Sequence, residues 1–129
     1  VAVQLNDVDA ATKIYPDIEI RKGTLAPTSP HGPGLSTDRL LGLLAQVMSD
    51  RQTATTHFED SIIFCRSAGY RPELAWAYSD YADLLRSSGQ SEDLTKAIGL
   101  LDEALNITQE LGMRPLMEKV LSRRDILKA

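Results

Sequence analysis

Few side chains in this sequence could do chemistry. Two are the histidines His31 and His57, and a third is the only cysteine, Cys65. Asp60 follows His57 at i+3, which would place both on one helix face, but zinc sites take three or four ligands and a single acid at that spacing is a poor site. We therefore predict that His57 is a surface or edge residue and that the chain holds no metal.

The remaining candidates also favour structural roles. Cys65 falls on the apolar stripe of its predicted helix, which indicates a buried, inert thiol. The acidic pairs Glu59-Asp60 and Asp102-Glu103 could serve acid–base catalysis, but they lie off the apolar stripes and are typical of a solvated helix face. The sequence contains neither a glycine-rich phosphate loop nor a Ser-His-Asp arrangement. We predict no enzyme and no cofactor.

Composition sets the broad class. The 129 residues are 43% hydrophobic and only 5% aromatic, which suits one Leu/Ala-packed helical domain. The net charge of −4 and the lack of a basic block argue against nucleic acid as a partner. One cysteine fits a reducing compartment, and no segment is apolar enough to span a membrane. We expect a cytoplasmic protein, and because residue 1 is not Met, a piece of a longer one.

A phrase occurs twice. GYRP at 69–72 returns as GMRP at 112–115, a shift of 43 residues. Upstream of it, FEDSI at 58–62 aligns with LDEAL at 101–105 and keeps the chemical type at each position. An internal period of this size is typical of stacked repeats.

Apolar residues at helical spacing predict the elements that carry these phrases. Between residues 35 and 129 we expect helices only, in segments 37–49, 50–69, 72–89, 94–112 and 115–129. Gly69 and Gly112 follow the last apolar residues of their helices, as left-handed C-caps do. Pro72 and Pro115 then start the next helices. Such short connections predict antiparallel neighbours.

Other turn residues are interpreted in the same way. Arg71 and Arg114 lie between the helices, where they bind either the carbonyls of the preceding helix, which we favour, or a ligand. Ser91 is the predicted N-cap of its helix, and Asp50 or Ser49 that of an earlier one.

These segments resemble the tetratricopeptide repeat (TPR) family. The resemblance covers about residues 35–129 and implies an all-α fold of tandem antiparallel helix-turn-helix units, an α-α superhelix, with about two full units and one extra helix. Its motif residues are Leu41-Gly42, Ala45, Ala54, Phe58 and Ser61 in the first unit, and Tyr81-Ala82, Leu85, Gly89, Ala97, Leu101 and Ala104 in the second. Ser49 departs from the pattern, because it stands where the family has a turn glycine.

The run from Gly69 to Met113 is similar, more narrowly, to helical-repeat regions that follow the ATPase module of large bacterial multidomain signalling proteins. Adenylate or guanylate cyclases and LuxR-type regulators are examples. This likeness implies a scaffold or sensory piece of such a protein.

In TPR proteins the first helix of each unit lines a concave groove that binds peptides or partner helices. Carried over by motif position, the groove residues are Arg39, Leu43, Gln46, Trp76, Ser79, Asp83, Arg86, Lys119, Ser122 and Ile126. Trp76 lies off its apolar stripe, so it is either a groove anchor or packs against the preceding unit. The mixture of charges predicts an acidic or mixed-charge peptide as the partner.

Two other functions stay open. The last helix carries Leu116, Met117, Val120 and Leu121 with no further helix to cover them, which predicts self-association into a homodimer. The other function is a small-molecule sensor.

Residues 1–34 differ from the rest. Ala11, Tyr15 and Ile18 repeat the spacing of a second repeat helix and predict a remnant of an upstream unit, although residues 17–25 alternate as a short strand would. The prolines and glycines of 26–34 predict an exposed loop.

Overall fold

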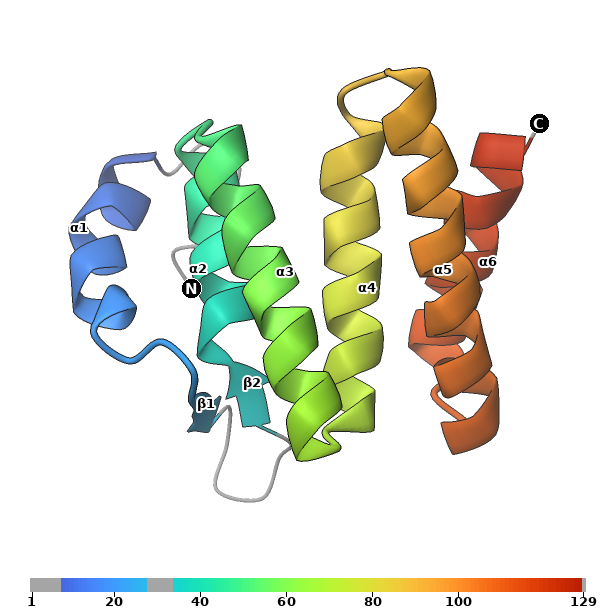
Figure 1. Ribbon diagram of the computed structural model, residues 1–129, viewed down its shortest axis with the longest axis horizontal. Coiled ribbons are helices and arrows are strands. Elements are labelled where there is room, and N and C mark those ends of the chain that lie inside the picture. The colour runs from blue at the N-terminus through green and yellow to red at the C-terminus, as the bar shows by residue number, and fades with distance from the viewer. Residues whose placement is uncertain (1–7, 28–33, 129) are drawn as a thin grey trace.

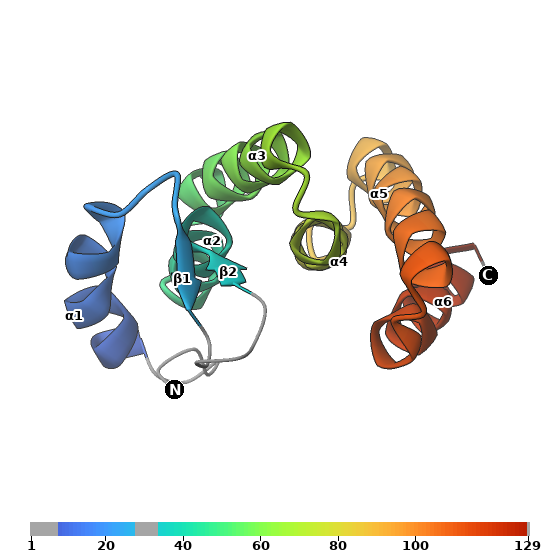
Figure 2. The same ribbon diagram turned by 90° about the horizontal axis from the view of Figure 1, so that it is seen from below.

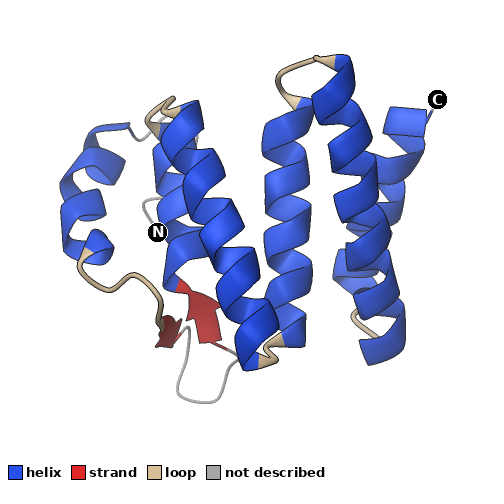
Figure 3. Ribbon diagram, in the orientation of Figure 1, coloured by secondary structure: helices blue, strands red, loops and turns tan. Residues whose placement is uncertain are grey.

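A computed structural model describes residues 8–27 and 34–128 (Figure 1). The described residues form six helices and one short hairpin, so the predicted all-α fold is confirmed for this part of the chain (Figure 3). In chain order the elements are α1 (Val8–Glu19), β1 (Leu25–Pro27), β2 (Gly34–Ser36), α2 (Thr37–Val47), α3 (Arg51–Ala68), α4 (Arg71–Arg86), α5 (Ser91–Leu111) and α6 (Arg114–Lys128). None of these helices is both long enough and apolar enough to cross a bilayer.

Consecutive helices pack side by side and run in alternating directions (Figure 1). Seen from below, α4 lies between α2 and α6, while α3 and α5 lie toward the opposite side (Figure 2). We call the side formed by α2, α4 and α6 the even face. The helices of this face carry the groove residues that were predicted from the sequence.

The two turns predicted from GYRP and GMRP, which link α3 to α4 and α5 to α6, have the same structure. Gly69 and Gly112 adopt left-handed φ values of 76° and 69°. In each turn the next residue's N–H donates, at 2.9 Å, to the carbonyl that also accepts from the glycine. Arg71 and Arg114 begin the following helices, so each proline occupies a first-turn position where no hydrogen bond is lost.

The remaining turns agree in part. Asp50 caps α3 through its side chain, which accepts from Thr53 N at 3.2 Å. Ser49 has a φ of 60° and so takes a left-handed conformation that glycine adopts more readily. Ser91 is not the cap of α5 but its first residue, and Gln90 occupies the cap position.

The main core lies between the helix layers and has α4 at its centre. Gly42 shows why small residues are needed where helices cross, because an added Cβ would lie 2.8 Å from the Phe58 ring. Cys65 is fully buried as predicted, and burial raises the pKa of its thiol.

The N-terminal segment covers the other end of this stack. α1 packs on α2 through a small cluster of Ala11, Leu44 and Val47. The proposed strand over 17–25 is wrong, since α1 continues to Glu19 and a turn follows it. The loop prediction is wrong at both its ends, where β1 and β2 pair antiparallel with Leu25 opposite Ser36. Residues 28–33, including His31, lie outside the described residues.

The prediction that His57 is a surface or edge residue is also wrong. Its side chain is 3% exposed, because α1 and α2 cover this side of α3. The hydroxyl of Tyr15 in α1 lies 2.5 Å from its Nε2 atom. A histidine that local spacing placed at the surface is therefore buried by residues far away in sequence.

Candidate functional site

The centre of the even face is Trp76 of α4. The guanidinium carbon of Arg39, from α2, lies 5.6 Å from the centroid of the indole ring. Lys119 Nζ, from α6, lies at the same distance of 5.6 Å. These are cation–π distances. Trp76 is half-buried and also packs against the main core, so one ring joins three helices that are distant in sequence.

Arg39 belongs to a buried ion cluster with two carboxylates of α4, and we call Arg39, Glu73 and Asp80 the Arg39 cluster. Arg39 Nε and Nη2 donate to the two oxygens of Glu73 at 2.6 and 3.2 Å, and Nη1 donates to Asp80 at 2.6 Å. Ser36 N–H also donates to Glu73, at 2.7 Å, and Ser61 Oγ lies 2.8 Å from Ser36 Oγ. The three charged side chains are 14%, 7% and 10% exposed.

Burial dominates the electrostatics of this cluster. Burial raises the pKa of Glu73 above its ordinary value even though Arg39 and the Ser36 N–H favour the charged form. Burial likewise raises the pKa of Asp80, against the attraction of Arg39 and Lys119. Arg39 therefore donates its hydrogen bonds to two carboxylates that would destabilise the fold if they were buried without a partner.

A second ion cluster lies between α4 and α6 and is more open to solvent. Asp83 accepts from Arg123 Nε at 3.2 Å, and Lys119 Nζ and Arg86 Nη2 each lie 3.8 Å from its carboxylate. We call these four residues the Asp83 cluster. Their side chains are between 25% and 34% exposed. Three cations thus lie around one carboxylate, and Lys119 is also attracted by Asp80. The two clusters together hold four cations and three carboxylates, which leaves a small local excess of positive charge on a chain whose net charge is −4.

The structure brings only some of the predicted groove residues together. Five of them form the two clusters or contact Trp76: Arg39, Trp76, Asp83, Arg86 and Lys119. Leu43 and Gln46 are half-buried, whereas Ser122 and Ile126 are exposed. Ser79 is fully buried, and its hydroxyl finds no partner among the described residues, so it does not line a surface.

Sequence reasoning missed Glu73, Asp80 and Arg123. A signal for two of them was present, because Glu73, Trp76, Asp80 and Asp83 recur at i, i+3, i+7 and i+10 and so form one stripe on α4. The stripe was overlooked because acids beside an apolar stripe usually mark solvent.

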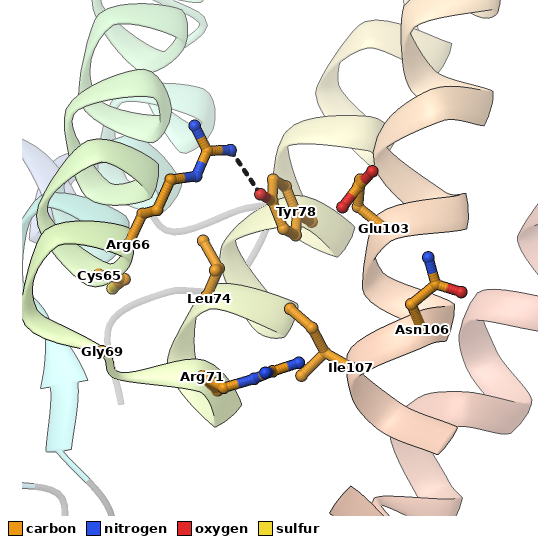
Figure 4. A pocket seen from close by; sticks show the side chains of 9 residues that line it. All are labelled: Cys65, Arg66, Gly69, Arg71, Leu74, Tyr78, Glu103, Asn106 and Ile107. Carbon is orange, nitrogen blue, oxygen red and sulfur yellow. Dashed lines mark hydrogen bonds between the residues drawn. The ribbon is translucent and has the colours of Figure 1, made fainter. Parts of the chain in front are cut away.

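A hollow of about 360 Å³ lies on the other side of the molecule, among α3, α4 and α5 (Figure 4). Arg66 reaches across it to donate to the Tyr78 hydroxyl at 2.6 Å. Arg71, which also lines it, pairs with Glu110 at 2.5 Å, so our preferred interpretation of Arg71, a bond to helix carbonyls, is wrong. Both arginines are engaged within the protein, and we assign no ligand here.

The apolar residues of α6 are more covered than predicted. Leu116 and Val120 are 2% and 0% exposed because they pack into the core on α5. Met117 and Leu121 are half-buried. The prediction that all four lie uncovered is wrong, since α5 alone shields much of this helix.

Comparison of the chain with protein-family models, with curated proteins and with solved structures gave no match. Its function must therefore be argued from the geometry described above.

Proposed function

We propose that this chain is a TPR-like repeat module of a larger cytoplasmic signalling protein, and that its even face binds an acidic peptide or partner helix. Its role is binding rather than catalysis. The observation that carries the proposal is that Arg39 of α2 and Lys119 of α6 both lie against the Trp76 ring of α4. The cations of the Asp83 cluster lie beside them.

Helix spacing supports the repeat interpretation. The starts of α2 at Thr37 and of α4 at Arg71 are 34 residues apart, which is the length of a TPR unit. The next start, at Arg114, follows after 43 residues, mainly because α4 has 16 residues against 11 in α2 and α5 has 21 against 18 in α3. The turn between α4 and α5 is also one residue longer than the turn between α2 and α3. The identical connections at Gly69 and Gly112 also fit stacked units, which we expect to continue as a superhelix.

Charge supports an acidic ligand. An incoming carboxylate could pair with Lys119 or Arg123, which are partly exposed and both lie against the Asp83 carboxylate. The exposed edge of Trp76 offers apolar contact beside them, and tryptophan with arginine is typical of binding hot spots. Burial of Leu116 and Val120 supports this proposal over self-association through α6.

A selection from a random 12-residue peptide display library tests this proposal. We expect enriched peptides to be rich in Asp and Glu, and we expect Lys119→Glu and Arg123→Glu to weaken their binding by about tenfold or more, because attraction becomes repulsion. Lys128→Glu is the matched control, since it makes the same charge change on α6 at an exposed residue beyond the Asp83 cluster. Peptides without acidic enrichment, or equal loss in all three variants, would contradict the proposal.

A further inference from the structure

A second group of polar side chains lies at the other end of the helix stack, where α1, α2 and α3 meet (Figure 1). Asp38 of α2 and His57 and Asp60 of α3 each offer one ligand atom, and these three atoms lie within 4.8 Å of one another. Asp38 and His57 are buried, whereas Asp60 is exposed. The cluster therefore has a closed side and a side open to solvent.

His57 is the unusual member of this group. Its side chain is 3% exposed, yet its Nδ1 atom has no hydrogen-bond partner among the described residues. The nearest carboxylate oxygen, Asp38 Oδ1, lies 3.8 Å away, which is too far for a hydrogen bond. It is not too far for two ligands of one ion, because each would lie about 2.0–2.2 Å from a zinc centre.

The two buried residues are also held as metal ligands usually are. Tyr15 Oη lies 2.5 Å from His57 Nε2, whereas the other ring nitrogen, Nδ1, is the one that lies 3.8 Å from Asp38. Gly23 N–H donates at 2.9 Å to Asp38 Oδ2, the oxygen that does not face His57. Partners of this kind fix the orientation of a ligating imidazole and carboxylate and leave the other atom of each free for the ion.

The hydrogen-bond partner of His57 is compatible with an ion at Nδ1. The Tyr15 hydroxyl can accept as well as donate. His57 can therefore carry its proton on Nε2, donate it to Tyr15, and present Nδ1 as a lone pair.

We propose that Asp38, His57 and Asp60 form a binding site for a divalent transition-metal cation of the Zn²⁺ class. One imidazole with two carboxylates suits zinc or a related ion better than magnesium, which prefers oxygen ligands alone. Three protein ligands leave a coordination position for water on the Asp60 side. A hollow of about 310 Å³, lined in part by Lys22, Asp38 and Asp60, gives an entry route there.

The proposed site would link three helices, α1, α2 and α3. Its ligands come from α2 and α3, and Tyr15 adds α1 through the imidazole. Bound metal would therefore stabilise the docking of α1 on the repeats. This inference does not depend on peptide binding at the even face.

Titration of the untagged, metal-free full chain with CoCl₂, followed by ZnCl₂, tests the site. We expect one Co²⁺ per chain, visible d–d absorption bands from bound cobalt, and their loss when Zn²⁺ displaces it. Asp60→Asn should weaken binding by at least the roughly 10- to 100-fold that even a supporting residue contributes. Asp60 is exposed on α3, so this variant is expected to fold, which circular dichroism checks.

Three further variants make the result specific. His57→Gln should abolish the cobalt bands, and Tyr15→Phe should weaken binding by about tenfold through loss of the supporting hydrogen bond. Lys22→Gln should tighten binding because it removes a positive charge from the entry route. His31→Gln, which removes the only other histidine, should bind as the wild type does. No saturable binding, binding unchanged in His57→Gln, or binding lost in His31→Gln would overturn the proposal.

Discussion

The two ion clusters of the even face use the same chemistry in different surroundings. In the Arg39 cluster, between α2 and α4, the three side chains are at most 14% exposed and the guanidinium makes three hydrogen bonds. In the Asp83 cluster, between α4 and α6, the side chains are 25% to 34% exposed and three cations lie around one carboxylate. We call the Arg39 cluster the dry junction because its charged side chains are nearly buried, and the Asp83 cluster the wet junction because its side chains are partly exposed to solvent.

This difference in exposure suggests different roles for the two clusters. A buried charge without its partner is strongly destabilising, so the Arg39 cluster must remain intact for α2 and α4 to pack. Ion pairs exposed to solvent contribute about 0–1 kcal/mol to stability, so the Asp83 cluster can exchange partners at little cost. We infer that the same arrangement of acids and bases holds the fold at one junction and recognises a ligand at the other.

The largest expected effect comes from breaking the dry junction. Arg39→Met should lower the free energy of unfolding by about 3–5 kcal/mol, because Glu73 and Asp80 would remain buried without a counter-ion. Urea denaturation at neutral pH measures this. The triple variant Arg39→Met, Glu73→Gln, Asp80→Asn should recover at least half of the loss, since the buried charges are gone. A loss below about 1 kcal/mol for the single variant would mean that this junction is no drier than the other.

The pH dependence of the same variant sharpens the point. Burial raises the native pKa of Glu73 and Asp80, and removing Arg39 raises it further. Above the unfolded pKa values of about 4, the native state then binds more protons than the unfolded chain, so stability falls as pH rises. We expect the deficit of Arg39→Met to shrink when unfolding is measured at about pH 5 instead of about pH 8. A deficit that stays constant with pH would show that the carboxylates are not its cause.

At the wet junction the expected effects are smaller and concern binding. Asp83→Asn should change the free energy of unfolding by less than about 1 kcal/mol. The same change should tighten binding of an acidic peptide by about fivefold, because the cations lose their internal competitor. Asp102→Asn is the matched control, since its carboxylate pairs with Arg124 of α6 at 3.3 Å but lies on α5. Calorimetry in which both variants bind like the wild type would remove the distinction between the junctions.

The parts of the fold that were predictable are those that local chemistry determines. Gly69 and Gly112 end their helices because glycine tolerates a positive φ, and each is followed by a proline that suits the next helix start. The hairpin of β1 and β2 was missed because Pro27 and Gly34 weaken any strand signal. Arg71 was misinterpreted because its partner, Glu110, is 39 residues away.

The candidate site was predictable only as far as the family pattern reached. Helix phase and the TPR resemblance placed Arg39, Trp76 and Lys119 on one side. Burial could not be predicted in the same way, which is why Ser79 was assigned to a surface that it does not reach. The metal ligands were missed for a related reason: Asp38 meets His57 across two helices, and no spacing along the chain reveals that.

Trp76 is the only tryptophan of the chain, so its fluorescence reports on the even face directly. The most direct test of acidic-peptide binding is a titration of the protein with a Glu-rich 12-residue peptide, and with a Lys-rich peptide of equal length, while Trp76 emission is recorded. We expect a saturable change with the Glu-rich peptide only, and a smaller change at high salt because the contacts are partly exposed. No change with the Glu-rich peptide, or an equal change with both, would contradict it.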